Sequence, residues 1–356
     1  MKAMILAAGL GTRLRPLTNM VSKPMVQMGG RPCMEYAVRL LKNHGIREVA
    51  VNLHYKPHLI KQYFGDGSPF GLKIQYSYED KLLGTAGGFK RLQHFFKGDT
   101  ALIISGDGLT DINLNDFYRF HKEKGCLATL ALKRVPNPQD YGVVQLKEGS
   151  CLEVFQEKPS PQEAVSNLAN TGIYLFEPEI FDYIPPDTFY DFGKELFPQF
   201  VARGIDMAGY LMEGYWCDIG NLDIYREAHY DLLMGRVKAE LPGQRLADNV
   251  WVGQGINIHP EAVVKGPVVL GDNCQVKKGA HIMGPAVLGK NTVVEEKALL
   301  KRSILWDEVC LGPQTHLEDS ILGEGLHVHE GRYLKGEVWE GHQLDSSLYV
   351  SGGIKE

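Results

Sequence analysis

A glycine-rich stretch near the N-terminus combines a pliable backbone with positive charge. Residues 9–16 read Gly-Leu-Gly-Thr-Arg-Leu-Arg-Pro and directly follow a short apolar run. Glycines let a backbone approach phosphate oxygens closely, and consecutive N–H groups can then form a nest for an anion. The forked guanidinium groups of Arg13 and Arg15 suit phosphate geometry, and Lys23 follows near enough in the chain to fold over the same anion. The stretch therefore predicts a phosphate-binding turn.

Two other interpretations of this turn fit less well. A plain strand-to-helix turn needs one glycine and no arginines. The dinucleotide-binding fingerprint GxGxxG needs a glycine at position 14, where this chain has Leu14. The arginines and the later lysine therefore favour a phosphate site over a dinucleotide-binding turn.

The elements that must carry this turn alternate between apolar runs and helical patterns. Met34, Val38 and Leu41 stand at helical spacing before Gly45, and a further helix is expected after Asn221. The expected strands are residues 2–7, 48–53, 74–78, 101–105, 127–132, 142–146 and 172–176. Strands separated by helices predict βαβ units and a mixed, mostly parallel, Rossmann-like sheet. The pattern predicts an α/β domain over residues 1–235 and a linker over 236–250.

The last third has a period of six residues, and we expect residues 251–356 to form a second domain. The first position of each unit is aliphatic in Val252, Ile258, Val264, Leu270, Val276, Ile282, Leu288 and Val294. The position four residues later is mostly small, in Ile256, Ala262, Val268, Cys274, Ala280, Ala286, Thr292 and Ala298. A period of six matches neither a helix nor a flat strand. It is typical of a β-helix whose turns stack, with the aliphatic side chain inward and the small one at a corner.

The six-residue frame is expected to slip once, near residues 301–304. It resumes with Leu305, Leu311 and Leu317 at the first position and Val309, Thr315 and Ile321 at the second. The triplets Ser303-Ile304-Leu305 and Ser320-Ile321-Leu322 echo each other. Residues 331–356 show no clear pattern, and we expect them to cap the solenoid or to pack on the first domain.

Composition narrows the class of protein. Of 356 residues, 44% are hydrophobic and 23% charged, as in a globular protein with a substantial core. A net charge of −5 gives no reason to expect nucleic acid or a membrane surface as a partner. The six cysteines include no CxxC pair, so a reducing, cytoplasmic setting fits better than a disulfide framework. No apolar stretch is long enough to span a membrane, and the N-terminal run is too short for a signal peptide.

The chain resembles the sugar-1-phosphate nucleotidyltransferases, also called nucleotide-sugar pyrophosphorylases. The resemblance begins with residues 9–18 and Lys23-Pro24, and it continues in the family's order over nearly the whole chain. Further matching segments are Leu83–Gly88, Ser105-Gly106-Asp107, Tyr141-Gly142-Val143, Glu157-Lys158-Pro159, Asn170–Tyr174 and Trp216–Gly220. In this family a hexapeptide left-handed β-helix commonly follows the catalytic domain. The resemblance implies that a sugar-1-phosphate attacks the α-phosphate of a nucleoside triphosphate, forming an NDP-sugar and pyrophosphate.

The resemblance also implies roles for particular residues. Arg13, Lys23 and Lys158 are expected to be catalytic, because phosphoryl chemistry depends on positioning and charge stabilisation. The expected nucleotide site comprises Leu6, Ala8, Gly9, Gly11, Thr12, Arg13, Glu79, Gly84 and Thr85. The expected sugar-phosphate site comprises Gly142, Glu157, Lys158, Asn170 and Gly172.

Asp107 and Asp218 are the expected ligands of Mg²⁺. A hard cation takes a few carboxylates and leaves its other positions to phosphate oxygens and water. Asp107 comes just after an apolar strand, at the edge where open α/β sheets bind ligands. A single aspartate is usually a turn or cap residue, which is the interpretation we prefer for Asp111.

Several alternatives stay open from sequence. The layout is most similar to mannose-1-phosphate guanylyltransferases, and also to glucose-1-phosphate uridylyl- and thymidylyltransferases. A regulatory paralogue that binds nucleotide sugar without making it is a second class. Acyl transfer at the β-helix is a third, for which histidines are available at His259, His281, His316, His327 and His329. A homo-oligomer, either dimer or tetramer, is expected because solenoid flanks often pair.

Overall fold

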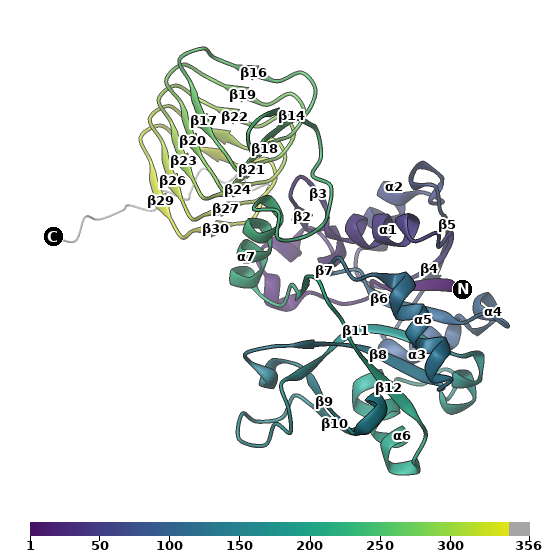
Figure 1. Cartoon of the computed structure of the whole chain (residues 1–356). Coiled ribbons are helices and arrows are strands. Elements are labelled where there is room, and N and C mark those ends of the chain that lie inside the picture. The colour runs from purple at the N-terminus through teal and green to yellow at the C-terminus, as the bar shows by residue number, and fades with distance from the viewer. Residues whose placement is uncertain (342–356) are drawn as a thin grey trace. The chain divides into compact units, whose positions relative to one another are not determined.

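The computed structural model describes residues 1–341, which divide into two compact units (Figure 1). The first unit comprises Met1–Leu14 and Val21–Ala239. The second comprises Arg15–Met20 and the described part of Glu240–Glu356. The chain therefore leaves the first unit at Arg15, near the end of the glycine–arginine stretch, and returns to it at Val21.

A nine-stranded sheet forms the centre of the first unit. Its main path runs β10-β9-β11-β6-β1-β4-β5, and β8 joins β11 to β12. Strands β6, β1, β4 and β5 are mutually parallel, whereas β11 runs antiparallel to β6. The strands are β1 (Lys2–Leu6), β4 (Glu48–Leu53), β5 (Lys73–Tyr78), β6 (Ala101–Ser105), β8 (Ala128–Arg134), β9 (Gly142–Leu146), β10 (Leu152–Glu157), β11 (Leu168–Phe176) and β12 (Met207–Leu211).

Helices and short strand pairs complete this unit. The helices are α1 (Cys33–Asn43), α2 (Pro57–Phe64), α3 (Gly84–Arg91), α4 (Gln93–Phe96), α5 (Leu114–Lys124), α6 (Phe197–Arg203) and α7 (Leu222–Leu233). The short pairs are β2 (Gln27–Met28) with β3 (Arg31–Pro32) and β7 (Gly108–Thr110) with β13 (Trp216–Asp218). The α/β class predicted from sequence is confirmed. The expected strand at 172–176 extends back to Leu168, so β11 is longer than predicted.

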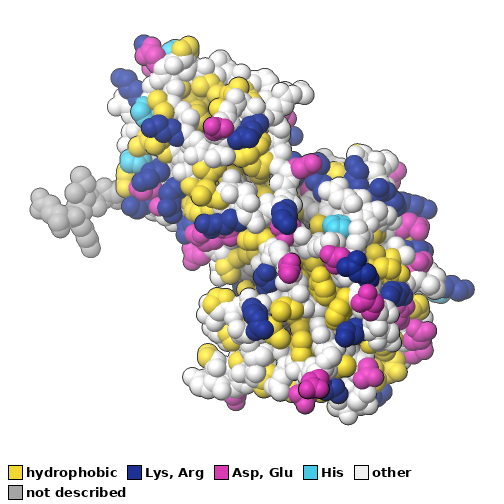
Figure 2. All heavy atoms as spheres, in the orientation of Figure 1, with side chains coloured by type: hydrophobic (Ala, Val, Ile, Leu, Met, Phe, Trp, Pro, Cys, Tyr) yellow, Lys and Arg dark blue, Asp and Glu magenta, His cyan; other side chains and the backbone are white. Residues whose placement is uncertain are grey.

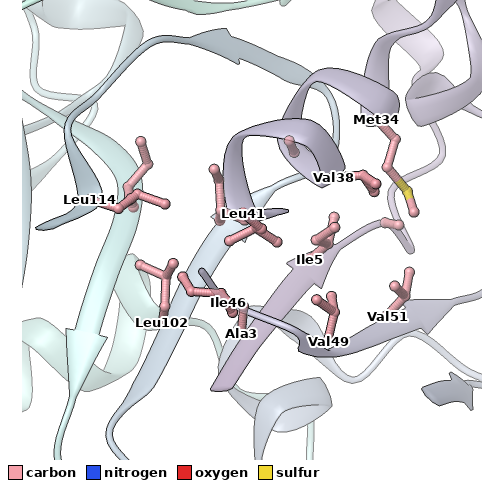
Figure 3. Packing of buried hydrophobic residues seen from close by; sticks show 14 of the residues in the cluster. Ala3, Ile5, Met34, Val38, Leu41, Ile46, Val49, Val51, Leu102 and Leu114 are labelled. Atoms are coloured by element: carbon pink, nitrogen blue, oxygen red, sulfur yellow. The ribbon is translucent and has the colours of Figure 1, made fainter. Parts of the chain in front are cut away.

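Alternation along the parallel strands divides the core into two layers. Ala3 and Ile5 of β1 and Val49 and Val51 of β4 point to one face, where they pack with the apolar side of α1 (Figure 3). Met4, between them, joins the cluster on the other face. Burying an aliphatic side chain contributes roughly 1.5–3 kcal/mol, so a sheet covered on both faces is strongly favoured. The result is a rigid sheet whose strand ends can hold a site.

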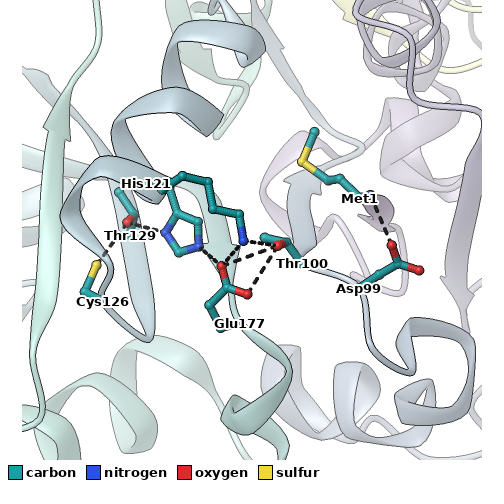
Figure 4. A network of polar contacts seen from close by, with 8 residues as sticks. Met1, Asp99, Thr100, His121, Cys126, Thr129 and Glu177 are labelled. Carbon is teal, nitrogen blue, oxygen red and sulfur yellow. Dashed lines mark hydrogen bonds and ion pairs between the residues drawn. The ribbon is translucent and has the colours of Figure 1, made fainter.

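A buried polar network fixes α5 to the sheet at the amino end of β6 (Figure 4). His121 lies 2.7 Å from Thr129 Oγ1 through Nδ1 and 2.9 Å from Glu177 Oε1 through Nε2. Lys122 also donates to Glu177 and to Thr100 Oγ1. Burial lowers the pKa of His121, and the nearby Glu177 carboxylate opposes that shift without cancelling it. These contacts stabilise the sheet end opposite to Ser105, which leaves the carboxyl end available for chemistry.

The surface mixes charges of both signs. Figure 2 shows lysine, arginine, aspartate and glutamate side chains interspersed with hydrophobic ones over the visible face. Opposite charges so close together largely cancel each other's field at a distance. Among residues 1–341, no helix combines the length and the apolar character needed to cross a bilayer.

Three sheets, parallel except for one edge strand, stack the strands of the second unit into a β-helix (Figure 1). The first contains β14 (Gln244–Ala247), β15 (Val250–Val252), β18 (Val268–Leu270), β21 (Ala286–Leu288), β24 (Ile304–Leu305), β27 (Ile321–Leu322) and β30 (Val338–Trp339), with β14 antiparallel to β15. The second contains β16 (Asn257–Ile258), β19 (Gln275–Val276), β22 (Val293–Val294), β25 (Cys310–Leu311) and β28 (His327–Val328). The third contains β17 (Val263–Lys265), β20 (His281–Met283), β23 (Leu299–Lys301), β26 (His316–Glu318) and β29 (Tyr333–Lys335). This arrangement is consistent with the β-helix predicted from the six-residue period, and with the left-handed form that the family resemblance implied.

The first-position residues predicted from Val252 to Val294 all belong to one apolar cluster or pack against it. The frame, however, slips more often than predicted. Leu270 pairs with Leu288, eighteen residues on, whereas Leu288 pairs with Leu305, seventeen residues on. Each later coil keeps the shorter length, so the predicted second position at Ile321 is wrong and Ser320 occupies it. A buried serine can fill a corner because its hydroxyl is bonded, here to Glu318 O at 2.8 Å.

Part of the C-terminal segment continues the solenoid. The sequence predicted no pattern after residue 331, but β29 and β30 form a further coil there. Residues 342–356, included in the expected cap, lie outside the described residues.

The stability of the first unit should depend on pH through His229. This histidine of α7 is 1% exposed, its Nδ1 donates to Tyr225 O at 2.9 Å, and its Nε2 has no hydrogen-bond partner. Burial lowers its pKa to about 4. Between about pH 6.5 and pH 4, His229 is protonated in the unfolded chain but stays neutral in the folded unit. The free energy of unfolding should therefore fall as the pH drops through this range, by up to about 3 kcal/mol.

Urea unfolding at pH 7 and pH 5, followed by the helical circular dichroism signal, measures this effect. Helices α1–α7 all belong to the first unit, so the signal reports on it. His229→Leu should lose less stability between the two pH values than the unsubstituted protein does. The exposed His58→Leu serves as the control and should keep the full difference. An equal pH difference in all three proteins would contradict the assignment to His229.

Candidate active site

A polar cavity of about 330 Å³ opens at the carboxyl ends of the central strands of the first unit. Leu6 ends β1, Ser105 ends β6, and both line the cavity. The full lining is Leu6, Arg13, Lys23, Thr85, Ser105, Asp107, Gly108, Asp140, Tyr141, Gly142, Glu157, Lys158, Asn170, Thr171, Gly172, Tyr174, Asp191, Phe192, Gly193, Trp216 and Asp218. The site lies where ligands bind in open α/β sheets.

The two aspartates reach the same place because of a short strand pair. Asp107 immediately precedes β7, and Asp218 ends β13. In the antiparallel register of this pair, Asp218 stands opposite Gly108. Residues more than one hundred positions apart are thereby brought together at the cavity.

Lys23 lies between the two carboxylates. Its Nζ is 2.6 Å from Asp107 Oδ2 and 3.4 Å from Asp218 Oδ1. Burial alone would lower the pKa of Lys23, but the charges of Asp107 and Asp218 overcome this and raise it above its ordinary value. Burial would likewise raise the pKa of Asp107, and the Lys23 ammonium holds it below its usual range instead. Lys23 and Asp107 are therefore both ionised at neutral pH.

Another part of the cavity is built from the β9–β10 pair. Glu157 of β10 stands opposite Gly142 of β9, and Lys158 donates its backbone N–H to Tyr141 O at 3.1 Å. Burial raises the pKa of Glu157. A methyl group on Gly142 or on Gly193 would come within 2.9 or 2.6 Å of Glu157 Oε2. A methyl group at either position would therefore displace the Glu157 carboxylate.

Strand β11 adds polar groups through an irregularity in its pairing. The register of β11 against β8 shifts between Asn170 and Tyr174. Asn170 Nδ2 donates to Tyr174 Oη at 2.9 Å, and Gly172 N donates to Asn170 Oδ1 at 3.2 Å. Bulges of this kind commonly turn side chains toward a site. Asn170 and Gly172 both line the cavity.

Some of the predicted nucleotide-binding residues line the cavity, and others do not. Leu6, Arg13 and Thr85 line the cavity, and a methyl group added to Gly220 would lie 3.3 Å from Arg13 Nη1. Within the described residues, the lining does not include Ala8, Gly9, Gly11, Thr12, Glu79 or Gly84. Gly84 is instead confined by backbone, because a methyl group there would lie 2.5 Å from Tyr190 O.

Asp191 is a prominent lining residue that the sequence analysis missed. Its Oδ2 accepts from Thr85 Oγ1 at 2.8 Å, and its Oδ1 accepts from Gly193 N at 2.9 Å. Its backbone N–H donates to Glu195 Oε2, so Asp191 caps the helical turn that follows it and is held in place by that turn. An aspartate is a common cap residue, but a cap by itself does not indicate a binding site.

Trp216 and Tyr141 add an aromatic wall. Their ring centroids are 5.2 Å apart in an edge-on arrangement, and Trp216 Nε1 donates to Thr171 O at 3.0 Å. Between residues 1 and 341, no three histidine, cysteine, aspartate or glutamate side chains are grouped to hold a metal ion. The carboxylates of Asp107 and Asp218 are thus the acidic pair of the cavity nearest to Lys23.

Comparisons with known proteins agree on both units. The family model of nucleotidyl transferases matches residues 2–235, and a model described as the GMPPB C-terminal domain matches residues 246–351. A solved structure from Bacillus anthracis, provisionally described as a glucose-1-phosphate thymidylyltransferase and crystallised with a sucrose, is similar with a TM-score of 0.61. It is 24% identical and covers 68% of this chain and 97% of its own, which supports the fold.

Relatives with curated names match over most of the chain. A UTP–glucose-1-phosphate uridylyltransferase of Synechocystis is 37% identical, over 90% of this chain and 87% of that protein. A mannose-1-phosphate guanylyltransferase of Mycobacterium tuberculosis is 33% identical over 78% and 77%. A mannose-1-phosphate guanylyltransferase catalytic subunit beta of Dictyostelium discoideum is 33% identical over 94% of each. The chain therefore belongs to the nucleotidyl transferase family, as a sugar-1-phosphate nucleotidyltransferase.

Proposed function

We propose that the cavity binds a nucleoside triphosphate beside Arg13 and Lys23 and a sugar-1-phosphate beside Glu157 and Lys158. The observation that carries this proposal is the set of charges that line one cavity. Arg13, Lys23 and Lys158 all line it, and the carboxylates of Asp107 and Asp218 stand beside Lys23. Such a set of charges suits two phosphate-bearing substrates and a divalent cation.

The reaction would be an in-line displacement at the α-phosphorus. A phosphate oxygen of the sugar-1-phosphate forms the new P–O bond, and the bond to pyrophosphate breaks. Lys158 would orient the attacking phosphate and neutralise part of its charge. Arg13 would hold the β- and γ-phosphates and stabilise the charge that grows on pyrophosphate. Lys23, already held by two carboxylates, would stand by the α-phosphate without needing to reorient.

The donor groups fit a magnesium ion. Mg²⁺ is usually held by one or two carboxylates together with substrate phosphates and water, and Asp107 and Asp218 supply two. When bound, the ion would supply positive charge to the phosphate oxygens. Ser105 Oγ donates to Asp107 Oδ1 and would keep that carboxylate in place.

For the substrates, GTP and mannose-1-phosphate are our first proposal. Several relatives carry mannose-1-phosphate guanylyltransferase names. Glucose-1-phosphate with UTP or dTTP is the second candidate, supported by the name of the 37% identical relative. Base choice depends on a few hydrogen bonds between the protein and the base. A wrong base is strongly disfavoured because it leaves buried polar groups of the site without a partner.

We also propose a cytoplasmic homo-oligomer, either a dimer or a tetramer. All six cysteines are free thiols, which suits a reducing compartment. Size-exclusion chromatography with light scattering would determine the assembly, and a monomer at micromolar concentration would contradict it.

A substrate matrix tests the proposed function. Four nucleoside triphosphates are combined with mannose-, glucose- and N-acetylglucosamine-1-phosphate, and pyrophosphate release is measured. We expect kcat/KM for GTP with mannose-1-phosphate to exceed the other pairs. A preference for UTP or dTTP with glucose-1-phosphate would favour the second candidate, and no release from any pair would favour a regulatory paralogue.

Loss of either central carboxylate should abolish turnover. Asp107→Asn and Asp218→Asn should each lower kcat by on the order of 100-fold or more, because fewer ligands remain for magnesium and Lys23 loses a partner. Chelation by EDTA should stop the unsubstituted enzyme, and added Mg²⁺ should restore it. Asp206→Asn, an exposed control, should behave as the unsubstituted enzyme. Turnover within about twofold of normal in either test variant would refute the metal proposal.

Lys158→Ala should affect one substrate selectively. The loss of a charge-assisted contact costs about 1.5–3 kcal/mol, so KM for the sugar-1-phosphate should rise at least about tenfold. KM for the nucleoside triphosphate should stay near normal. Steady-state kinetics with each substrate varied in turn make the measurement, with the exposed Lys147→Ala as a matched control. Equal rises in both KM values would contradict the assignment of Lys158 to the sugar phosphate.

A further inference from the structure

Asn52 is a buried polar residue outside the cavity that the expected chemistry does not use. It lies near the carboxyl end of β4 and is 3% exposed. In the parallel register it stands beside Leu6, the last residue of β1. Asn52 therefore lies next to the residues that lead from β1 into the glycine–arginine turn.

The two halves of its amide bond to two different segments. Asn52 Oδ1 accepts from the backbone N–H of Ala7 at 2.9 Å. Asn52 Nδ2 donates to Glu79 Oε1 at 2.8 Å. A side chain of this length that both accepts and donates is an amide, so neither aspartate nor leucine can replace it without leaving a buried group unpaired.

Glu79 continues the connection toward α3. Its Oε2 accepts from Leu83 N at 3.0 Å, and its backbone carbonyl accepts from His54 Nδ1 at 2.7 Å. A methyl group on Gly88 of α3 would lie 2.5 Å from Glu79 Oε1 and 3.0 Å from Asn52 Nδ2. At Gly88, α3 is thus packed directly against the side chains of Asn52 and Glu79.

We propose that Asn52 is a positioning residue that fixes the Glu79–Gly88 segment against the turn after β1. The proposal rests on the proposed function, in which this segment borders the nucleotide through Thr85. Asn52 sets the distance between the part of the site that holds phosphates and the part that adjoins the base. It acts on nucleotide affinity and base choice and leaves the sugar-phosphate site unaffected.

The experiment is a double-variant cycle on Asn52 and Glu79. Asn52→Asp places two buried carboxylates in contact, which should raise KM for the preferred nucleoside triphosphate about tenfold or more. KM for the sugar-1-phosphate should change less than about twofold. Glu79→Gln in the Asn52→Asp background restores a hydrogen bond between the two side chains, with donor and acceptor exchanged. It should therefore recover most of the lost nucleotide affinity. The effects of substitutions at two residues in contact are not additive, whereas the effects of substitutions far apart add.

Direct binding separates this inference from the proposed reaction. Calorimetric titration of GTP, and of UTP where the matrix prefers it, reports nucleotide affinity even if no turnover occurs. The Kd should follow the same pattern of loss and rescue, and the ratio of GTP to UTP affinity should change. Asn115→Asp, an exposed position on α5, is the matched control and should alter nothing. Thermal unfolding of every variant confirms that the fold is retained.

Three results would overturn the inference. One is an Asn52→Asp variant with normal nucleotide KM and Kd. Another is an equal loss for both substrates, which indicates general damage. The third is a double variant whose losses simply add. If Asn52→Asp does not fold, Asn52→Ser replaces it, since serine is too short to reach both partners, and normal nucleotide Kd in that variant would equally refute the inference.

Discussion

One ammonium held between two carboxylates organises the candidate site. Lys23 lies 2.6 Å from Asp107 and 3.4 Å from Asp218, so three charges share a small, largely buried space. Buried charges are costly unless each is paired, and here each charge compensates the desolvation of another. The arrangement requires the strand pair β7–β13, which connects distant parts of the chain. A change in that pairing would separate Asp218 from Asp107 and leave Lys23 with one partner.

The same constraint explains why glycines surround the cavity. Gly142 and Gly193 leave the space that Glu157 occupies, and Gly220 leaves the space beside Arg13. Added methyl groups would displace the Glu157 carboxylate at Gly142 and Gly193 and press on the Arg13 guanidinium at Gly220. The polar network around His121 stabilises the opposite end of the sheet, so rigidity and chemistry occupy different ends of the same strands.

Sequence reasoning reached the parts of this site that are encoded locally. Arg13, Lys23, Asp107, Lys158 and Asp218 were chosen from short motifs, and the structure brings all five to one cavity. Their roles in the reaction remain predictions. Asp191 and Asn52 were not found, because their importance comes from contacts across the fold, such as Asp191 with Thr85. No local pattern records which distant backbone N–H an amide will meet.

The β-helix shows the same division between local and spatial information. Inward positions followed from the six-residue period, since each unit repeats the same local geometry. The change from eighteen- to seventeen-residue coils was harder to predict from sequence. Where a coil is one residue shorter, adjacent residues such as Ile321 and Leu322 are both aliphatic, so either could be the inward position. The register between coils, together with the hydrogen bond from Ser320 N to Ser303 Oγ at 3.1 Å, distinguishes the corner at Ser320 from its neighbour Ile321. A repeat thus encodes its period in the sequence and its exact register in the contacts between coils.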